Sequence, residues 1–318
     1  MRSNKHRGAV AALASFFTAS AVAAPLAFVT NQGASTVSVL DLGTQKTLAT
    51  LPVGRKPAGV AIDRRRHFVF VTAPDSHEVS VIDAARLAVV KSLPAGDNPL
   101  GIAADPVRDR LYVADFYAKR VIAFDTTTLT QTYTLVTGET PAGIAVSPSG
   151  DRLAVANRDD DTLTFFDAET RQALTTIKVG HAPFGVNYAP DGARLFVANV
   201  KSGDVSVVDA HAMTELYKVK VGEYPYASAL DPKRDRLFVT NQQAGTVSVV
   251  DLGERKEIAR IPVDDYPEGI GYARDSGLIY VASWFGNSLS AIDPATLEVK
   301  TTLPCGDGSR AFGDFILQ

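Results

Sequence analysis

The stretch "VTNQQAGTVSVVD" (Val239–Asp251) almost repeats an earlier one, "VTNQGASTVSVLD" (Val29–Asp41). The two copies lie 210 residues apart, which is five steps of 42 residues, and the intermediate copies are present. Units of 42 residues, seven in all, fill residues 25–318 without an insertion. The aspartate that ends the quoted stretch recurs at every step, as Asp41, Asp83, Asp125, Asp167, Asp209, Asp251 and Asp293. A fixed period of about 40 residues indicates a repeat architecture.

Each unit contains four short segments typical of β-strands. In the second unit these segments are "FVFVTA", "EVSVID", "LAVVKSLPA" and "PLGIAADP". The first is rich in β-forming residues, the second alternates with a period of two, and turn residues bound the others. Four strands per repeat of this length is the pattern of a propeller blade. The sequence therefore predicts an all-β, seven-bladed β-propeller with four antiparallel strands per blade.

Side-chain size and proline predict the strand order within a blade. The "PxGIA" segments carry glycine and alanine, which suit the crowded axis of a ring, so we expect them to be innermost. Proline removes a donor from the hydrogen-bond ladder and therefore favours an edge strand. The segments that contain Pro52, Pro94, Pro262 and Pro304 are accordingly expected to be outermost. The chain then begins at a second strand and ends with an innermost one, "AFGDFIL" (Ala311–Leu317), which would close the ring.

Residues 1–23 have the features of a secretory signal peptide. Arg2, Lys5 and Arg7 precede an apolar run, and Ala21-Val22-Ala23 matches an A-x-A cleavage site. We expect a mature chain, residues 24–318, that forms a single propeller and is exported, either to the periplasm or outside the cell. The apolar run is too short to span a bilayer comfortably, so we expect no membrane span after cleavage.

Charge and cysteine content narrow the classes of partner. Removal of the leader with its three basic residues leaves 29 Lys and Arg against 35 Asp and Glu, a net charge of about −6. A negative domain does not suit nucleic acid or an anionic membrane, since both bind positively charged surfaces. The single Cys305 allows no intramolecular disulfide, and other units hold small residues at its position, so a buried side chain is expected there. We expect a monomer.

The repeated pattern "VTN…TVSVVD…IPV…P.GI" resembles the YVTN-repeat β-propeller family over all seven units. The resemblance implies an exported bacterial propeller. Propellers of this broad group are similar to lactonase-like enzymes, electron-transfer structural subunits and surface-layer repeats. The same fold serves several functions, so the resemblance alone does not select one.

The internal repeat separates architectural residues from candidate functional ones. Residues present in every unit, such as the seven aspartates, are expected to serve the fold by accepting hydrogen bonds from turn N–H groups. Variation gathers in the loops after the second strand and in the connections between blades, which share one end of the ring, here called the top face. The opposite end, the bottom face, has repetitive hairpin turns with solvated charges.

Carboxylates follow the repeating glycine position around the top face. They could be solvated loop residues or oxygen ligands for Ca²⁺. The candidate metal ligands are Asp97, Glu139, Asp265 and Asp307. No motif indicates a quinone or dinucleotide, and no other cofactor is predicted.

Aromatic and charged residues gather in the last four blades of the top face. Exposed apolar clusters usually mark interaction sites. The candidate ligand-binding residues are Phe184, Tyr224, Tyr226, Tyr266, Glu268, Trp284, Phe285 and Arg310.

Two functions fit these residues. We favour a non-catalytic propeller that binds a partner protein, peptide or small ligand at the mouth of the channel on the top face. The alternative is a lactonase-like hydrolase at the same site, with or without assistance from a metal ion. In that enzyme His181 would be the base or acid, with Glu223 and Arg158 as charge partners. Against the enzyme, the chain has no G-x-S-x-G nucleophile motif.

Overall fold

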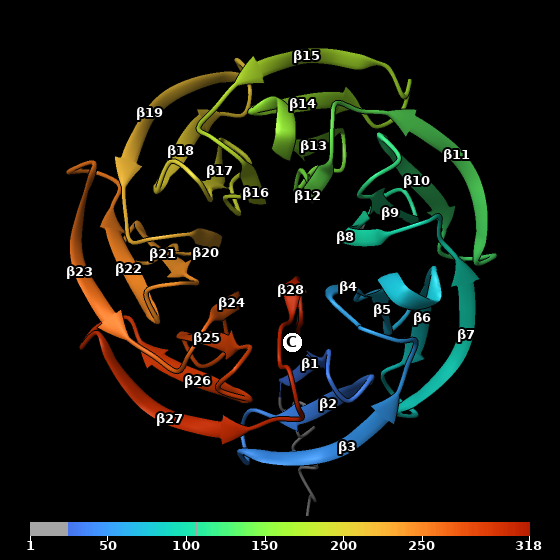
Figure 1. The fold of residues 1–318 in the computed structure, drawn as a ribbon, viewed down its shortest axis with the longest axis horizontal. Helices are drawn as coiled ribbons and strands as arrows, with labels where there is room; N and C mark the ends of the chain where they lie inside the picture. The colour runs from blue at the N-terminus through green and yellow to red at the C-terminus, as the bar shows by residue number, and fades with distance from the viewer. Residues whose placement is uncertain (1–24, 106) are drawn as a thin grey trace, which may run out of the picture.

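The computed structural model describes residues 25–105 and 107–318, which form a ring of seven sheets around a central channel (Figure 1). Each blade contributes four antiparallel strands, as predicted. The expected signal peptide, residues 1–23, lies outside the described residues. No helix within the described ranges is long and apolar enough to cross a bilayer.

The strand order matches the prediction from side-chain size and proline. Six innermost strands surround the axis: β4 (Gly59–Asp63), β8 (Pro99–Asp105), β12 (Pro141–Val146), β16 (Pro183–Tyr188), β20 (Pro225–Asp231) and β24 (Pro267–Ala273). The outermost strands form the rim: β3 (Lys46–Pro52), β7 (Ala88–Pro94), β11 (Thr130–Val136), β15 (Ala173–Lys178), β19 (Thr214–Lys220), β23 (Lys256–Pro262) and β27 (Glu298–Pro304).

The two middle strands of each blade are buried, and they make the core between blades. The second strands are β1 (Leu26–Asn31), β5 (Phe68–Ala73), β9 (Arg110–Asp115), β13 (Arg152–Asn157), β17 (Arg194–Asn199), β21 (Arg236–Asn241) and β25 (Leu278–Ser283). The third strands are β2 (Thr36–Asp41), β6 (Glu78–Asp83), β10 (Arg120–Asp125), β14 (Thr162–Asp167), β18 (Asp204–Asp209), β22 (Thr246–Asp251) and β26 (Ser288–Asp293). Two short 3₁₀ turns, η1 (Pro74–Ser76) and η2 (Arg158–Asp160), lie in top-face loops.

The repeated aspartates serve the fold, as expected. The Oδ1 atom of Asp41 accepts the N–H groups of Gly43 and Thr44 at 2.9 and 2.8 Å, and the equivalent aspartates accept turn N–H groups likewise. Repeated asparagines at the end of the second strand stabilise the blade in a similar way. Asn31 donates to Thr36 and Ser38 on the neighbouring strand, at 2.9 Å in both cases.

The repeated glycine of the innermost strands is explained by the contact between blades. A Cβ atom placed on Gly101 would lie 1.8 Å from the carbonyl oxygen of Ala142 in the next blade. On Gly143 it would lie 2.1 Å from the carbonyl oxygen of Phe184. Glycine therefore lets the innermost strands of neighbouring blades approach each other closely around the central channel.

The C-terminal segment closes the ring but differs from the single strand that we predicted. It forms two short strands, β28 (Phe312–Gly313) and β29 (Ile316–Leu317). β29 pairs with β1 and completes that sheet, as expected, whereas β28 pairs in parallel with β4 of the next blade. The break has a local cause: Gly313 has a φ of 113°, and Asp314 is hydrogen-bonded to Arg64 of that next blade.

Candidate functional site

The residues between the repeating proline and glycine converge on the top mouth of the channel. Phe184 and Tyr226 are buried there, with ring centroids 4.4 Å apart. Phe312 of β28 packs against both, at 5.2 Å from Phe184 and 5.4 Å from Tyr226. These three rings, here called the aromatic plug, fill the mouth of the channel rather than lining an open entrance.

A buried ion pair sits beside the aromatic plug. Arg310 donates from Nη2 to Tyr226 Oη at 2.8 Å and to Glu268 Oε1 at 3.1 Å, and its Nε contacts the other oxygen of Glu268. Gln242 donates to Glu268 at 2.5 Å. The Glu268 side chain is fully buried, and that of Arg310 is 13% exposed.

The electrostatics keep the Arg310 guanidinium charged and the Tyr226 phenol neutral. Burial opposes the charge of Arg310, but the Glu268 carboxylate overrides it and raises the pKa of the guanidinium. Burial raises the pKa of Tyr226, with a partial offset from the charge of Arg310. Tyr226 therefore remains a neutral acceptor for Arg310 throughout the neutral range.

Three further aromatic residues form a partly exposed group on the top face of the blade β24–β27, here called the aromatic cluster. Trp284 and Phe285 are stacked, with centroids 4.6 Å apart and planes at 19°. Tyr266 contacts Phe285 at 4.6 Å and Trp284 at 6.3 Å. Phe285 is 58% exposed. Aromatic residues that pack together at the surface are typical of binding sites for proteins or small ligands.

Arg310 joins the buried plug to the exposed cluster. Its guanidinium carbon lies 5.0 Å from the centroid of the Trp284 ring, within the range of a cation–π interaction. Because Glu268 and Tyr226 hold Arg310, they also fix the position of Trp284. Beside the cluster lies a small pocket of about 220 Å³, lined by Gln32, Gly33, Lys56, Trp284, Phe285, Asn287, Asp307 and Gly308.

Seven of the eight predicted ligand-binding residues thus fall into two sets. Phe184, Tyr226, Glu268 and Arg310 are in the plug and its ion pair, where they contact one another. Tyr266, Trp284 and Phe285 form the exposed cluster. Tyr224 is 42% exposed and stands apart from both sets of rings. Phe312 was missed because a two-residue strand that crosses to the next blade has no counterpart in the repeat.

His181 makes a contact that the sequence analysis did not predict. Its Nδ1 lies 2.7 Å from Asp161 Oδ2, and the other oxygen of Asp161 accepts the N–H of Ala182 at 2.9 Å. Burial opposes the charge of Asp161, but these hydrogen bonds prevail and lower its pKa. The His181 side chain is 74% exposed. The imidazole and the carboxylate therefore form a pair that solvent and solutes can reach.

Asp161 and His181 are 20 residues apart, and contacts at this spacing recur in other blades of the top face. Lys119 pairs with Glu139, and His77 contacts the backbone carbonyl of Asp97 at 2.6 Å. Residues at this spacing lie at the end of the loop after a second strand and at the start of the connection to the next blade. This regularity was the signal that could have paired Asp161 with His181.

The other predicted catalytic and metal-binding residues are not brought together. Arg158 pairs with its neighbour Asp159 at 2.7 Å, and no hydrogen bond or ion pair in the described residues joins it to His181 or Glu223. Within residues 25–105 and 107–318, no group of three or more His, Cys, Asp or Glu side chains could hold a metal ion. Asp97, Glu139, Asp265 and Asp307 therefore do not converge.

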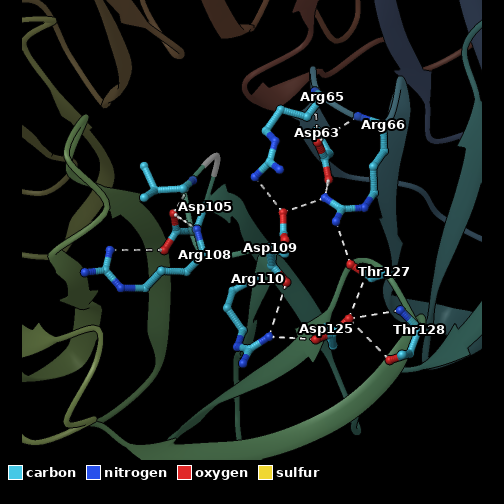
Figure 2. A network of polar contacts seen from close by, with 11 residues as sticks. Asp63, Arg65, Arg66, Asp105, Arg108, Asp109, Arg110, Asp125, Thr127 and Thr128 are labelled. Carbon is cyan, nitrogen blue, oxygen red and sulfur yellow. Dashed lines mark hydrogen bonds and ion pairs between the residues drawn. The ribbon is translucent and has the colours of Figure 1, made fainter.

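The bottom face is charged, and the consecutive arginines Arg64, Arg65 and Arg66 are paired there with aspartates. Figure 2 shows Asp109 between Arg65 and Arg66, at 2.9 and 2.6 Å. Arg66 also contacts Asp63 at 3.2 Å. Arg65 and Arg66 thus belong to a network of ion pairs between two blades, and Arg64 pairs with Asp314 of the C-terminal segment, so the run is not a free cationic patch.

Comparison with known proteins agrees with the fold. The family described as "Lactonase, 7-bladed beta-propeller" matches residues 87–220. The match covers 134 of the 318 residues, and the family's description agrees with the seven-bladed ring of the structure. No curated protein matches the sequence.

Two solved structures are similar to this propeller in fold. Hydrazine synthase of Kuenenia stuttgartiensis superposes with a TM-score of 0.77 at 22% identity, covering 84% of this chain and 92% of that one. The dihydro-heme d1 dehydrogenase NirN, in complex with DHE, superposes with a TM-score of 0.69 at 15% identity, covering 91% of this chain and 75% of that one. At these identities the likeness concerns the fold alone.

Proposed function

We propose that this protein is an exported binding module that holds a partner protein, peptide or small ligand on its top face, at the aromatic cluster of Tyr266, Trp284 and Phe285. The observation that carries the proposal is the support under the cluster. Trp284 rests on Arg310, which Glu268 and Tyr226 hold in place. An exposed aromatic surface with a fixed position loses little conformational entropy on binding.

The surroundings of the cluster suit a ligand with both apolar and polar groups. The exposed rings offer apolar area, and the adjoining pocket adds Lys56 and Asp307, one charge of each sign. Aromatic residues with a nearby arginine are the usual composition of binding hot spots. The ligand would then place an apolar group on Phe285 and Trp284 and a polar group in the pocket.

The test is capture of ligands from the exported fraction by the wild-type protein and by the variants Trp284→Ala and Phe285→Ala. Each substitution is expected to remove about 2 kcal/mol of binding free energy. Tyr117→Ala is the matched control, because Tyr117 is an aromatic residue, 74% exposed, on the top face of another blade. Since Trp284 is the only tryptophan, its fluorescence should follow the titration of any captured ligand. Equal capture by all four proteins would refute the site.

A second function has one observation in its favour. The lactonase family match covers residues 87–220 and therefore includes both Asp161 and His181. In a lactonase-like hydrolase His181 would act as the base, oriented by Asp161. The measurement is lactone and ester hydrolysis by wild-type protein and His181→Ala, with His77→Ala as the control histidine of the same rim. Activity that His181→Ala removes and His77→Ala retains would favour the enzyme.

A further inference from the structure

A cavity lies away from the top face, in the lower half of the central channel, where the innermost strands line it. It has a volume of about 530 Å³, within the range of small-molecule sites. Phe312 lines it from above and packs against the rest of the aromatic plug. Arg64, Arg274, Asp314 and Gln318 line it near the bottom turns. The cavity is therefore roofed by the plug and open toward the bottom face.

The wall of the cavity departs from the repeat in two adjacent blades. Asn187 replaces the alanine that four other blades have at its position: Ala61, Ala103, Ala145 and Ala229. Ser228 takes a position that holds valine or isoleucine in most blades. The Ser228 hydroxyl donates to Asn187 Oδ1 at 2.6 Å, and both residues line the cavity. This hydrogen bond occupies Oδ1 of Asn187, and no hydrogen bond of its amide Nδ2 is found among the described residues, so the amide is free to donate to a ligand.

The remaining wall is largely apolar. Ile102, Ile144, Val186 and Ile270 line it together with Phe312. The innermost strands are sheet edges, so their outer N–H and C=O groups also face the channel. The wall thus offers an apolar surface with few, localised hydrogen-bonding groups, which is typical of a small-molecule site.

An arginine at the bottom opening of the cavity is available to an anion. Arg64 is engaged by Asp314, at 2.5 and 3.0 Å, and by the carbonyl of Ile316 at 2.8 Å. Arg274 is exposed, and no ion pair of its guanidinium is found in the described part of the chain. Among the charged side chains that line the cavity, Arg64 and Asp314 pair with each other, and Arg274 is the one for which the described residues show no ion pair.

We propose that the lower channel binds a small monocarboxylate. Its apolar body lies against Ile102, Ile144 and Phe312, a hydrogen-bond acceptor on it takes the Asn187 amide, and its carboxylate pairs with Arg274. This site lies below the aromatic plug and is separate from the aromatic cluster of the proposed function.

The experiment is calorimetric titration of the protein with 4-acetylbenzoate, whose ketone oxygen is the acceptor for Asn187, and with 4-acetylbenzamide, its neutral analogue. 4-Acetylbenzoate is expected to bind the wild-type protein, and 4-acetylbenzamide about tenfold more weakly, because a hydrogen-bonded charge pair is replaced by a neutral contact. Arg274→Gln should abolish the difference between the two compounds. Asn187→Ala should weaken both, and it introduces only a residue that four other blades hold.

Arg86→Gln is the matched control. Arg86 is an exposed arginine of another bottom turn, paired with Asp83, and does not line the cavity. Its variant should bind both compounds as the wild-type protein does. The proposal is overturned if neither compound binds saturably up to about 10 mM, or if Arg274→Gln and Arg86→Gln behave alike. Binding lost in Trp284→Ala but kept in both cavity variants would also overturn it.

Discussion

The buried ion pair beside the aromatic plug can be tested by removing one partner. Arg310→Ala introduces the residue found at the equivalent positions Ala58 and Ala142, so the backbone there accepts alanine. The substitution leaves the fully buried carboxylate of Glu268 without its cation. An unpaired buried charge is costly, because the protein no longer compensates its lost hydration.

The structure sets the expected magnitude. Removing one partner of a buried ion pair typically costs about 3–5 kcal/mol. Gln242 still donates to Glu268, so we expect the lower end, about 3 kcal/mol, for Arg310→Ala. For a domain of this size this corresponds to a fall in melting temperature of roughly 6 °C. The double variant Glu268→Ala/Arg310→Ala removes the unpaired charge and should be more stable than Arg310→Ala.

The assay is a double-mutant cycle measured by urea unfolding. The coupling free energy between Glu268 and Arg310 is expected to exceed about 2 kcal/mol. The reasoning fails if the free energy of unfolding of Arg310→Ala lies within about 1 kcal/mol of the wild-type value. It also fails if the effects of the two single substitutions are additive, because the ion pair then does not stabilise the propeller.

Three other predictions concern stability and reactivity. Gly101→Ala should destabilise the protein by about 1–3 kcal/mol, measured by urea unfolding, because its Cβ would overlap the carbonyl oxygen of Ala142. Arg66→Gln should destabilise the protein at neutral pH but not in acid. The hydrogen bond from Arg66 lowers the pKa of Asp109, so the stability it provides is present above the pKa of an unfolded aspartate and is lost as pH falls through the folded value. Cys305 should resist thiol reagents at about pH 8 until the chain unfolds, since burial raises the pKa of its thiol to about 12.

Each of these predictions has a control or a contrary outcome. Gly253→Ala should be nearly silent, because its Cβ would lie 3.4 Å from the nearest atom, an oxygen of Asp251, in an exposed turn. A constant effect of Arg66→Gln from neutral to acid pH would contradict the linkage to Asp109. Rapid labelling of Cys305 in native protein would show that its side chain is accessible.

The repeat predicted most of the fold because every blade has the same four strands and packs against its neighbours through equivalent residues. Strand number, strand order and the role of the aspartates follow from residues such as Asp41 and Pro52, which recur with their surroundings. The split of the last strand into β28 and β29 did not follow. It depends on Gly313 and on the contact between Asp314 and Arg64, which join one end of the chain to another blade and have no copy in the repeat.

The candidate site was predicted less completely, because a break in symmetry shows where a residue is unusual but not whether it is exposed. Trp284 and Tyr226 both break the repeat on the top face, yet Trp284 is partly exposed, whereas Tyr226 is buried in the plug. The lower cavity was missed because Asn187 and Ser228 lie within strands that otherwise repeat. Their significance depends on which walls face each other across the channel.

The closing strands β28 and β29 have a consequence for biosynthesis. A chain made from its N-terminus forms β1–β3 long before Phe312–Leu317 emerge, so the inner edge of β1 stays open throughout elongation. An open strand edge can pair with other chains, and incomplete intermediates of large proteins are prone to aggregate. The ring therefore cannot close until Phe312–Leu317 have left the ribosome.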